Sequence, residues 1–212
     1  SLMTPILIFF FGIKPHMAVG TDLLFAAFTK MGGTVSLARQ RLVPWKVVGQ
    51  LCAGSIPAAL LALWALKVLG PASGTAQAIM TTTLGFALLL TAAATLYKVV
   101  AFSAQRQAAE AAARKSHTGD PTRPRHWSLP VLLGAVIGTL VTFTSVGAGA
   151  IGVTVLLLVY PMLPLPRIIG ADIAYAVPLT LVAGLGHASL GSVDWPLLAQ
   201  LLAGSLPGIW LG

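Results

Sequence analysis

The chain has 212 residues, of which 57% are hydrophobic and only 8% are charged, and its formal net charge is +8. Soluble domains carry about a quarter charged residues, so the composition excludes an ordinary soluble domain and indicates an integral membrane protein. The basic residues gather mainly in two segments, 39–46 and 98–125. Basic clusters beside apolar spans mark cytoplasmic loops, so the charge does not indicate nucleic-acid binding.

Apolar segments follow one another along the chain, several of them long enough for a bilayer crossing of about 20 residues. Segment 1–13 is too short to cross alone, and a turn is expected at 14–16. The remaining helices are predicted at 20–38, 47–66, 75–97, 128–145, 150–160, 168–190 and 195–212. The sequence therefore predicts an all-α, multi-pass membrane helix bundle.

A basic linker, 98–127, separates two membrane halves, 1–97 and 128–212, and its part 103–115 is expected to extend the preceding helix. In the second half, Gly147 and Gly149 separate two apolar segments and allow either close helix packing or a break. The segment that follows has about 11 residues and covers only half of the hydrocarbon thickness. This length favours a broken or re-entrant half-helix.

Residues 20–57 recur in outline at 170–207, at a constant offset of 150. The matching strings are Gly20-Thr21-Asp22 with Gly170-Ala171-Asp172, Trp45 with Trp195, and Gly54-Ser55-Ile56-Pro57 with Gly204-Ser205-Leu206-Pro207. Duplication in so apolar a chain indicates a transporter of two homologous repeats around a central site. By the same alignment, about one helix is expected to be missing at each end of the chain.

The two repeats are expected to be inverted. Loop 39–46 is basic, whereas its counterpart 190–194 contains no Lys or Arg, and such a difference places the loops on opposite sides of a membrane. Parallel repeats remain the alternative if 128–145 and 150–160 form a single crossing.

Two carboxylates occupy equivalent positions in the repeats, Asp22 and Asp172, each near the predicted start of a helix. A carboxylate in a first helical turn commonly caps free N–H groups. Ionisable groups within spans, however, usually mark ion pathways. The sequence leaves both interpretations open, and the second makes the pair the candidate for proton coupling.

Lys30 is the only Lys or Arg placed so deeply in a predicted span, and such a lysine usually faces a partner or a water-filled cavity. Hydroxyls and a histidine lie on this helix, on its counterpart 168–190 or beside the glycine-rich break, and Ser1 and Thr4 occupy the equivalent place in the first half. Each hydroxyl can instead bond its own helix. The free N–H groups at the start of 150–160 also suit an anion. The predicted substrate-binding residues are Lys30, Thr4, Ser1, Thr144, Ser145, Thr29, Thr180 and His187.

Several of these strings resemble the sulfite exporter TauE/SafE family of membrane transporters. They are Ser1-Leu2-Met3-Thr4-Pro5, Val19-Gly20-Thr21-Asp22-Leu23-Leu24, Gly54-Ser55-Ile56-Pro57, Gly170-Ala171-Asp172 and Gly204-Ser205-Leu206-Pro207-Gly208. The resemblance implies secondary transport of sulfite, sulfonates, sulfoacetate or similar anions across the cell inner membrane. The anion is expected near the midplane, between the halves, with protons as the coupling ion.

Two other functions fit the residues less well. A passive anion channel would use the same lining. An intramembrane serine protease would need Ser145 and His187 within hydrogen-bond reach, and neither residue has a polar equivalent in the other repeat. The expected partners are therefore the lipid bilayer, a small sulfur-containing anion and protons, with no cofactor, metal or enzymatic activity. An oligomer is possible on this sequence.

Overall fold

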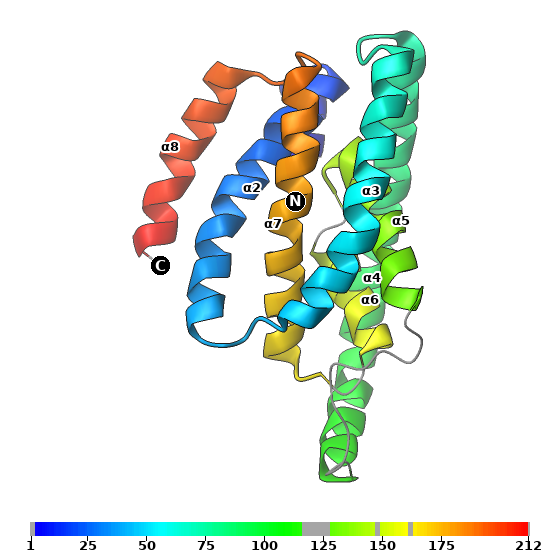
Figure 1. The fold of residues 1–212 in the computed structure, drawn as a ribbon, viewed down its shortest axis with the longest axis vertical. Coiled ribbons are helices and arrows are strands. Elements are labelled where there is room, and N and C mark those ends of the chain that lie inside the picture. Colours follow the sequence, from blue (N-terminus) through cyan, green and yellow to red (C-terminus); the bar gives the residue numbers. More distant parts are fainter. Residues whose placement is uncertain (1–2, 116–127, 147–148, 161–162, 212) are drawn as a thin grey trace.

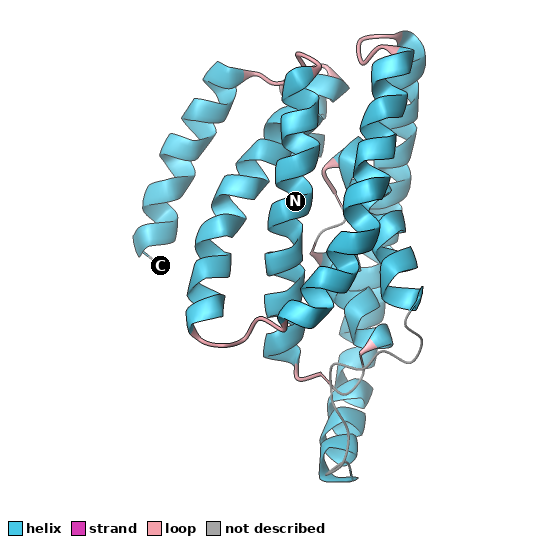
Figure 2. Cartoon of the chain, viewed as in Figure 1, coloured by secondary structure: helices cyan, strands magenta, loops and turns pink. Residues whose placement is uncertain are grey.

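The computed structural model describes residues 3–115, 128–146, 149–160 and 163–211. Within these ranges the chain is all-helical, as the composition predicts (Figures 1 and 2). The helices are α1 Met3–Phe9, α2 Pro15–Arg39, α3 Trp45–Leu69, α4 Gly74–Lys115, α5 Ser128–Thr144, α6 Ala150–Val159, α7 Leu165–Ser189 and α8 Trp195–Leu211. The predicted extension of the fourth helix to residue 115 is confirmed, and residues 116–127 of the linker lie outside the described ranges.

The long helices lie side by side and alternate in direction (Figure 1). In that view α2 runs downward, α3 returns upward, and α4 descends again and extends beyond the lower end of the bundle, whereas α7 runs upward and α8 downward. The loop between α2 and α3 and the end of α4 therefore share one end of the bundle. The loop between α7 and α8 lies at the other end.

Three helical stretches are long and apolar enough to cross a membrane among the described residues: Trp45–Leu69, Gly74–Leu96 and Leu165–Ser189. Their outward-facing side chains are large and apolar, as a lipid environment requires. On α3 and α4 these include Leu61, Trp64, Phe86 and Leu89, all exposed on the surface of the bundle. The protein is accordingly a membrane protein.

Small residues bring the backbones of α3 and α5 into contact. A Cβ atom added to Gly54 of α3 would lie 1.9 Å from the carbonyl oxygen of Val131, and one added to Gly138 of α5 would lie 2.5 Å from that of Ser55. Small side chains at such crossings are typical of membrane helices, which gain their contact from close packing. Glycine at these positions therefore allows the close distance between α3 and α5.

The predicted break between the fifth and sixth helices is present. Helix α5 ends at Thr144, Ser145 has φ +57°, Gly149 has φ +136°, and α6 begins at Ala150. A φ near +136° strongly favours glycine, which explains a glycine at the last position before α6. With 10 residues, α6 is about 15 Å long and reaches through only half of a bilayer core.

The start of α2 differs from the prediction, with a consequence for the carboxylates. Residues 14–16 do not form a separate turn, because Pro15 is the first residue of α2, a position that suits its fixed φ and missing N–H. Asp22 of α2 and Asp172 of α7 therefore each lie seven residues inside a helix, and neither helix has an acidic residue in its first turn. The capping interpretation is wrong for both residues.

The helix boundaries repeat with the same offset as the sequence motifs. Helices α2 and α7 both have 25 residues and begin 150 positions apart. Helices α3 and α8 begin at Trp45 and Trp195, again 150 positions apart. Each matching pair runs in opposite directions in Figure 1.

Candidate functional site

The first carboxylate is held by the short helix α1. Asp22 is 0% exposed, and the hydroxyl of Thr4 donates a hydrogen bond of 2.6 Å to its Oδ2. A hydrogen bond this short between a hydroxyl and a carboxylate is typical of a charge-assisted pair. The structure thus brings together two predicted site residues that are 18 positions apart, and it docks α1 against α2.

The second carboxylate lies toward the opposite end of the α2–α7 pair. A Cβ on Gly20 would lie 3.0 Å from Cβ of His187, and one on Gly184 would lie 2.7 Å from Leu24, so the two helices pack antiparallel. With this register and a rise of 1.5 Å per residue, Asp22 and Asp172 are separated by about 20 Å along the pair. Asp172 is also buried, at 3% exposure, and it has interaction partners.

Lys30 lies between the two carboxylates in depth. The α2–α7 register puts it at about the level of Val177, roughly 12 Å along the axis from Asp22 and 8 Å from the level of Asp172. Its side chain is half-buried and interacts electrostatically with both aspartates. Lys30 is therefore attracted by carboxylates on both α2 and α7.

Tyr175 is a candidate that the sequence analysis missed. It follows Asp172 by one helical turn on α7, its side chain is 0% exposed, and its hydroxyl has no hydrogen-bond partner among the described residues. The hydroxyl also lies within electrostatic range of Asp172 and of Cys52 on α3. In sequence, a tyrosine in an apolar helix is typical of core packing, and only the geometry reveals the unpaired hydroxyl.

Three of the predicted hydroxyls bond their own helices. Thr29 donates to the carbonyl of Phe25 at 2.9 Å, and Thr180 donates to that of Ala176 at 2.7 Å. Thr144 donates to the carbonyl of Leu140 at 2.7 Å and stabilises the end of α5. In this conformation these protons are used within the helices, which is the alternative that the sequence left open.

Ser145 and His187 are not hydrogen-bonded to each other. Nε2 of His187 lies 3.0 Å from the carbonyl oxygen of Thr142, a contact in which the nitrogen donates, and Oγ of Ser145 is buried without a partner in the described part of the chain. By the α2–α7 register, His187 lies opposite Gly20, about 15 Å along the axis from the level of Lys30. The structure does not bring it together with Lys30, and Ser1 lies outside the described residues.

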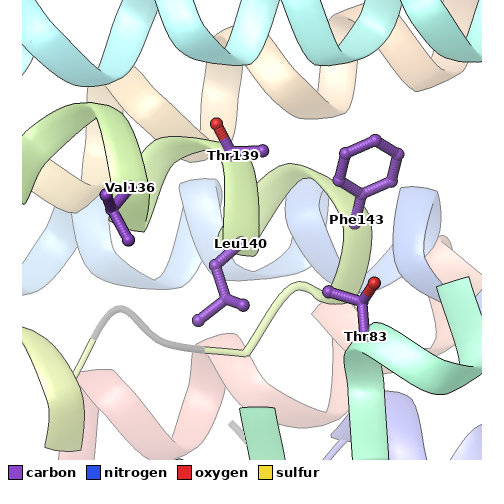
Figure 3. A pocket seen from close by; sticks show the side chains of 5 residues that line it. All are labelled: Thr83, Val136, Thr139, Leu140 and Phe143. Atoms are coloured by element: carbon purple, nitrogen blue, oxygen red, sulfur yellow. The ribbon is translucent and has the colours of Figure 1, made fainter. Parts of the chain in front are cut away.

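A groove of about 410 Å³ lies between α4 and α5, next to Thr144 at the end of α5 (Figure 3). It is lined by Thr83, Val136, Thr139, Leu140 and Phe143. The lining has two hydroxyls and no charged side chain. Among the described residues, no three His, Cys, Asp or Glu side chains group as a metal site would require.

Comparisons with known proteins agree with the resemblance seen in the motifs. The family model "Sulfite exporter TauE/SafE" matches residues 1–212. The "Probable membrane transporter protein YjnA" of Bacillus subtilis (strain 168) is 35% identical over 221 residues, which cover 100% of this chain and 80% of that protein. No solved structure matches the chain.

Proposed function

Because this chain belongs to the sulfite exporter TauE/SafE family of membrane transporters, we propose that it carries sulfur-containing oxyanions across the cell inner membrane by proton-coupled secondary transport. Sulfite, sulfonates and sulfoacetate are the proposed substrate class. The observation that carries the proposal is the arrangement of Lys30 between two buried carboxylates, Asp22 and Asp172.

The charges in this arrangement suit the two proposed ligands. A lysine inside a membrane bundle is costly unless it meets negative charge, and an oxyanion supplies that charge when it binds. Buried carboxylates that gain and lose a proton are the usual relay groups of transporters. In this proposal Lys30 binds the anion, and Asp22 and Asp172 bind and release the protons.

The matched helices support two inverted repeats, 1–97 and 128–212, joined by the linker 98–127. Helices α2 and α7 correspond in length and start and run in opposite directions, which is the relation expected of repeats about an axis in the membrane plane. The basic loop after α2 and the end of α4 share one end of the bundle, and this end is proposed to face the cytoplasm.

The test is transport by the full-length protein in proteoliposomes, with radiolabelled sulfite, thiosulfate, sulfoacetate and sulfate offered separately. Saturable flux of one sulfur anion that depends on an imposed pH gradient supports the proposal. Fast, unsaturable flux that ignores the gradient indicates a passive channel instead. Absence of flux for all four anions refutes the proposed substrate class.

A substitution tests the role of Lys30. Lys30→Met keeps a long apolar side chain and removes the charge, so we expect anion uptake to fall at least tenfold. Lys67→Met is the matched control, because Lys67 is exposed near the end of α3 and should leave uptake unchanged. Equal uptake by the wild type and Lys30→Met would remove Lys30 from the site.

A further inference from the structure

We propose that the Tyr175 hydroxyl donates a hydrogen bond to the transported oxyanion, and that the anion binds beside Asp172 only when this carboxyl carries a proton. The inference rests on the proposed function and deepens it. It adds a substrate-binding residue and couples the proton and the anion at one site.

The first observation is the state of the hydroxyl. Tyr175 is 0% exposed and its hydroxyl makes no hydrogen bond within the described residues, although a buried tyrosine hydroxyl usually finds a partner because leaving it unpaired costs free energy. The other tyrosine of this half, Tyr160, follows the rule and donates to Oε1 of Gln50 at 2.6 Å. The hydroxyl of Tyr175 therefore has a free donor for a ligand.

The second observation is its position. By the α2–α7 register, Tyr175 and Lys30 differ by only about 3 Å in depth, and Asp172 is the carboxylate within electrostatic range of both. Lys30 approaches from α2, and Cys52 of α3 lies within range of the Tyr175 hydroxyl. An ammonium group and a phenol hydroxyl thus lie on elements around one carboxyl group, at the same level of the bundle.

The equivalent residue of the first repeat indicates that the hydroxyl is not needed for packing. Position 25, which is 150 residues earlier, is Phe25. It packs against Leu24, Val193 and Leu198 in a hydrophobic cluster. An aromatic ring without a hydroxyl is therefore accepted at this place in a repeat, so the additional oxygen of Tyr175 has a role that only the second repeat requires.

The requirement for a proton follows from charge. An oxyanion placed beside an ionised carboxylate in a low-dielectric interior is repelled by several kcal/mol. When Asp172 is protonated, the repulsion disappears and its O–H becomes a further donor. Lys30, Tyr175 and protonated Asp172 then all donate to the anion, while Asp22 lies about 20 Å away along the helices. Asp172 therefore binds a proton when the anion binds and releases it when the anion dissociates.

The first test compares Tyr175→Phe with Tyr160→Phe in the full-length protein. Tyr175→Phe removes a donor to a charged ligand, so we expect about a tenfold rise in the KM for whichever of the four sulfur anions the wild type transports. We also expect the anion to stabilise this variant less against thermal unfolding than it stabilises the wild type. Tyr160→Phe should lower the melting temperature without changing the KM. Equal KM values for Tyr175→Phe and the wild type would overturn the role of the hydroxyl.

The second test addresses the proton. If only the protonated carboxyl accepts the anion, wild-type affinity is present at low pH and falls by about tenfold per pH unit once Asp172 ionises. Asp172→Asn is permanently neutral and still donates, so its anion affinity should be independent of pH and its flux independent of the pH gradient. Retention of the wild-type pH dependence by Asp172→Asn would refute the coupling. Loss of uptake in Lys30→Met alongside these negative results would leave anion transport through Lys30 standing and would remove only the role of Asp172 from the proposed function, whereas a wild type that moves no sulfur anion would refute both.

Discussion

Close packing of α3 on α5 can be tested at Gly54. A methyl group at this position would lie 1.9 Å from the carbonyl oxygen of Val131, whereas an ordinary carbon–oxygen contact is about 3.3 Å or longer. The added Cβ is fixed to the α3 backbone and the oxygen belongs to the α5 backbone, so Gly54→Ala must move α3 and α5 apart by more than about 1 Å. Overpacking of this severity costs about 3 kcal/mol, which corresponds to a fall of roughly 6 to 12 °C in melting temperature for a chain of this size.

The matched control is Gly49→Ala in the same helix. A Cβ atom at Gly49 would meet nothing within 4 Å, so this substitution changes helix propensity without changing packing. Alanine is favoured over glycine in a helix by about 1 kcal/mol, and both variants share this gain. The difference between Gly54→Ala and Gly49→Ala therefore isolates the cost of the contact.

The assay is thermal unfolding of the purified full-length protein in detergent. The fraction of protein that stays monodisperse is measured as the temperature rises. We expect Gly49→Ala to melt at or slightly above the wild-type temperature and Gly54→Ala to melt well below it. Equal melting temperatures for the two variants would show that α3 and α5 are not in backbone contact at Val131, and the close α3–α5 packing argued from glycine would fail with it.

Two further predictions concern buried hydrogen bonds. Thr4→Val removes the donor to Asp22, a bond to a charged group worth about 2 kcal/mol, so it should melt roughly 4 to 8 °C below Thr4→Ser, which keeps the hydroxyl; identical melting would contradict the bond. His187→Phe removes the donor to the Thr142 carbonyl and should cost about 1 kcal/mol, whereas His187→Gln can still donate and should lose less. If His187→Gln is the less stable of the two, the ring is held by packing rather than by its Nε2.

Most of the helical architecture could be predicted from the sequence. The lengths of the apolar segments and the glycine and proline residues between them are local signals. They predict α3 to α8 within a few residues of their observed ends. The sequence predicts the start of α2 about five residues too late, because proline is typical of turns but is also common at the first position of a helix. That error of five residues made Asp22 look like a cap, whereas it lies two turns inside α2.

The candidate site could be predicted only in part. A charged residue in an apolar span is visible in any sequence, which is why Asp22, Asp172 and Lys30 were identified. Which hydroxyls are free is a three-dimensional property: Thr29 and Thr180 bond to carbonyls of their own helices, while Tyr175 does not. Whether a hydroxyl is paired depends on the helices around it, and nothing in the local sequence encodes that.

The opposite directions of α2 and α7 have a consequence for how the protein would change shape. In the proposed inverted repeats, the two halves need not have the same conformation at any moment. If the two halves exchanged their conformations, the bundle would adopt the arrangement related to the first by a half-turn about an axis in the membrane plane, and it would open to the other side. The contact between Thr4 and Asp22 would then have its counterpart around Asp172. Two conformations, exchanged between the proposed halves, would then be enough to open the site to each side of the membrane in turn.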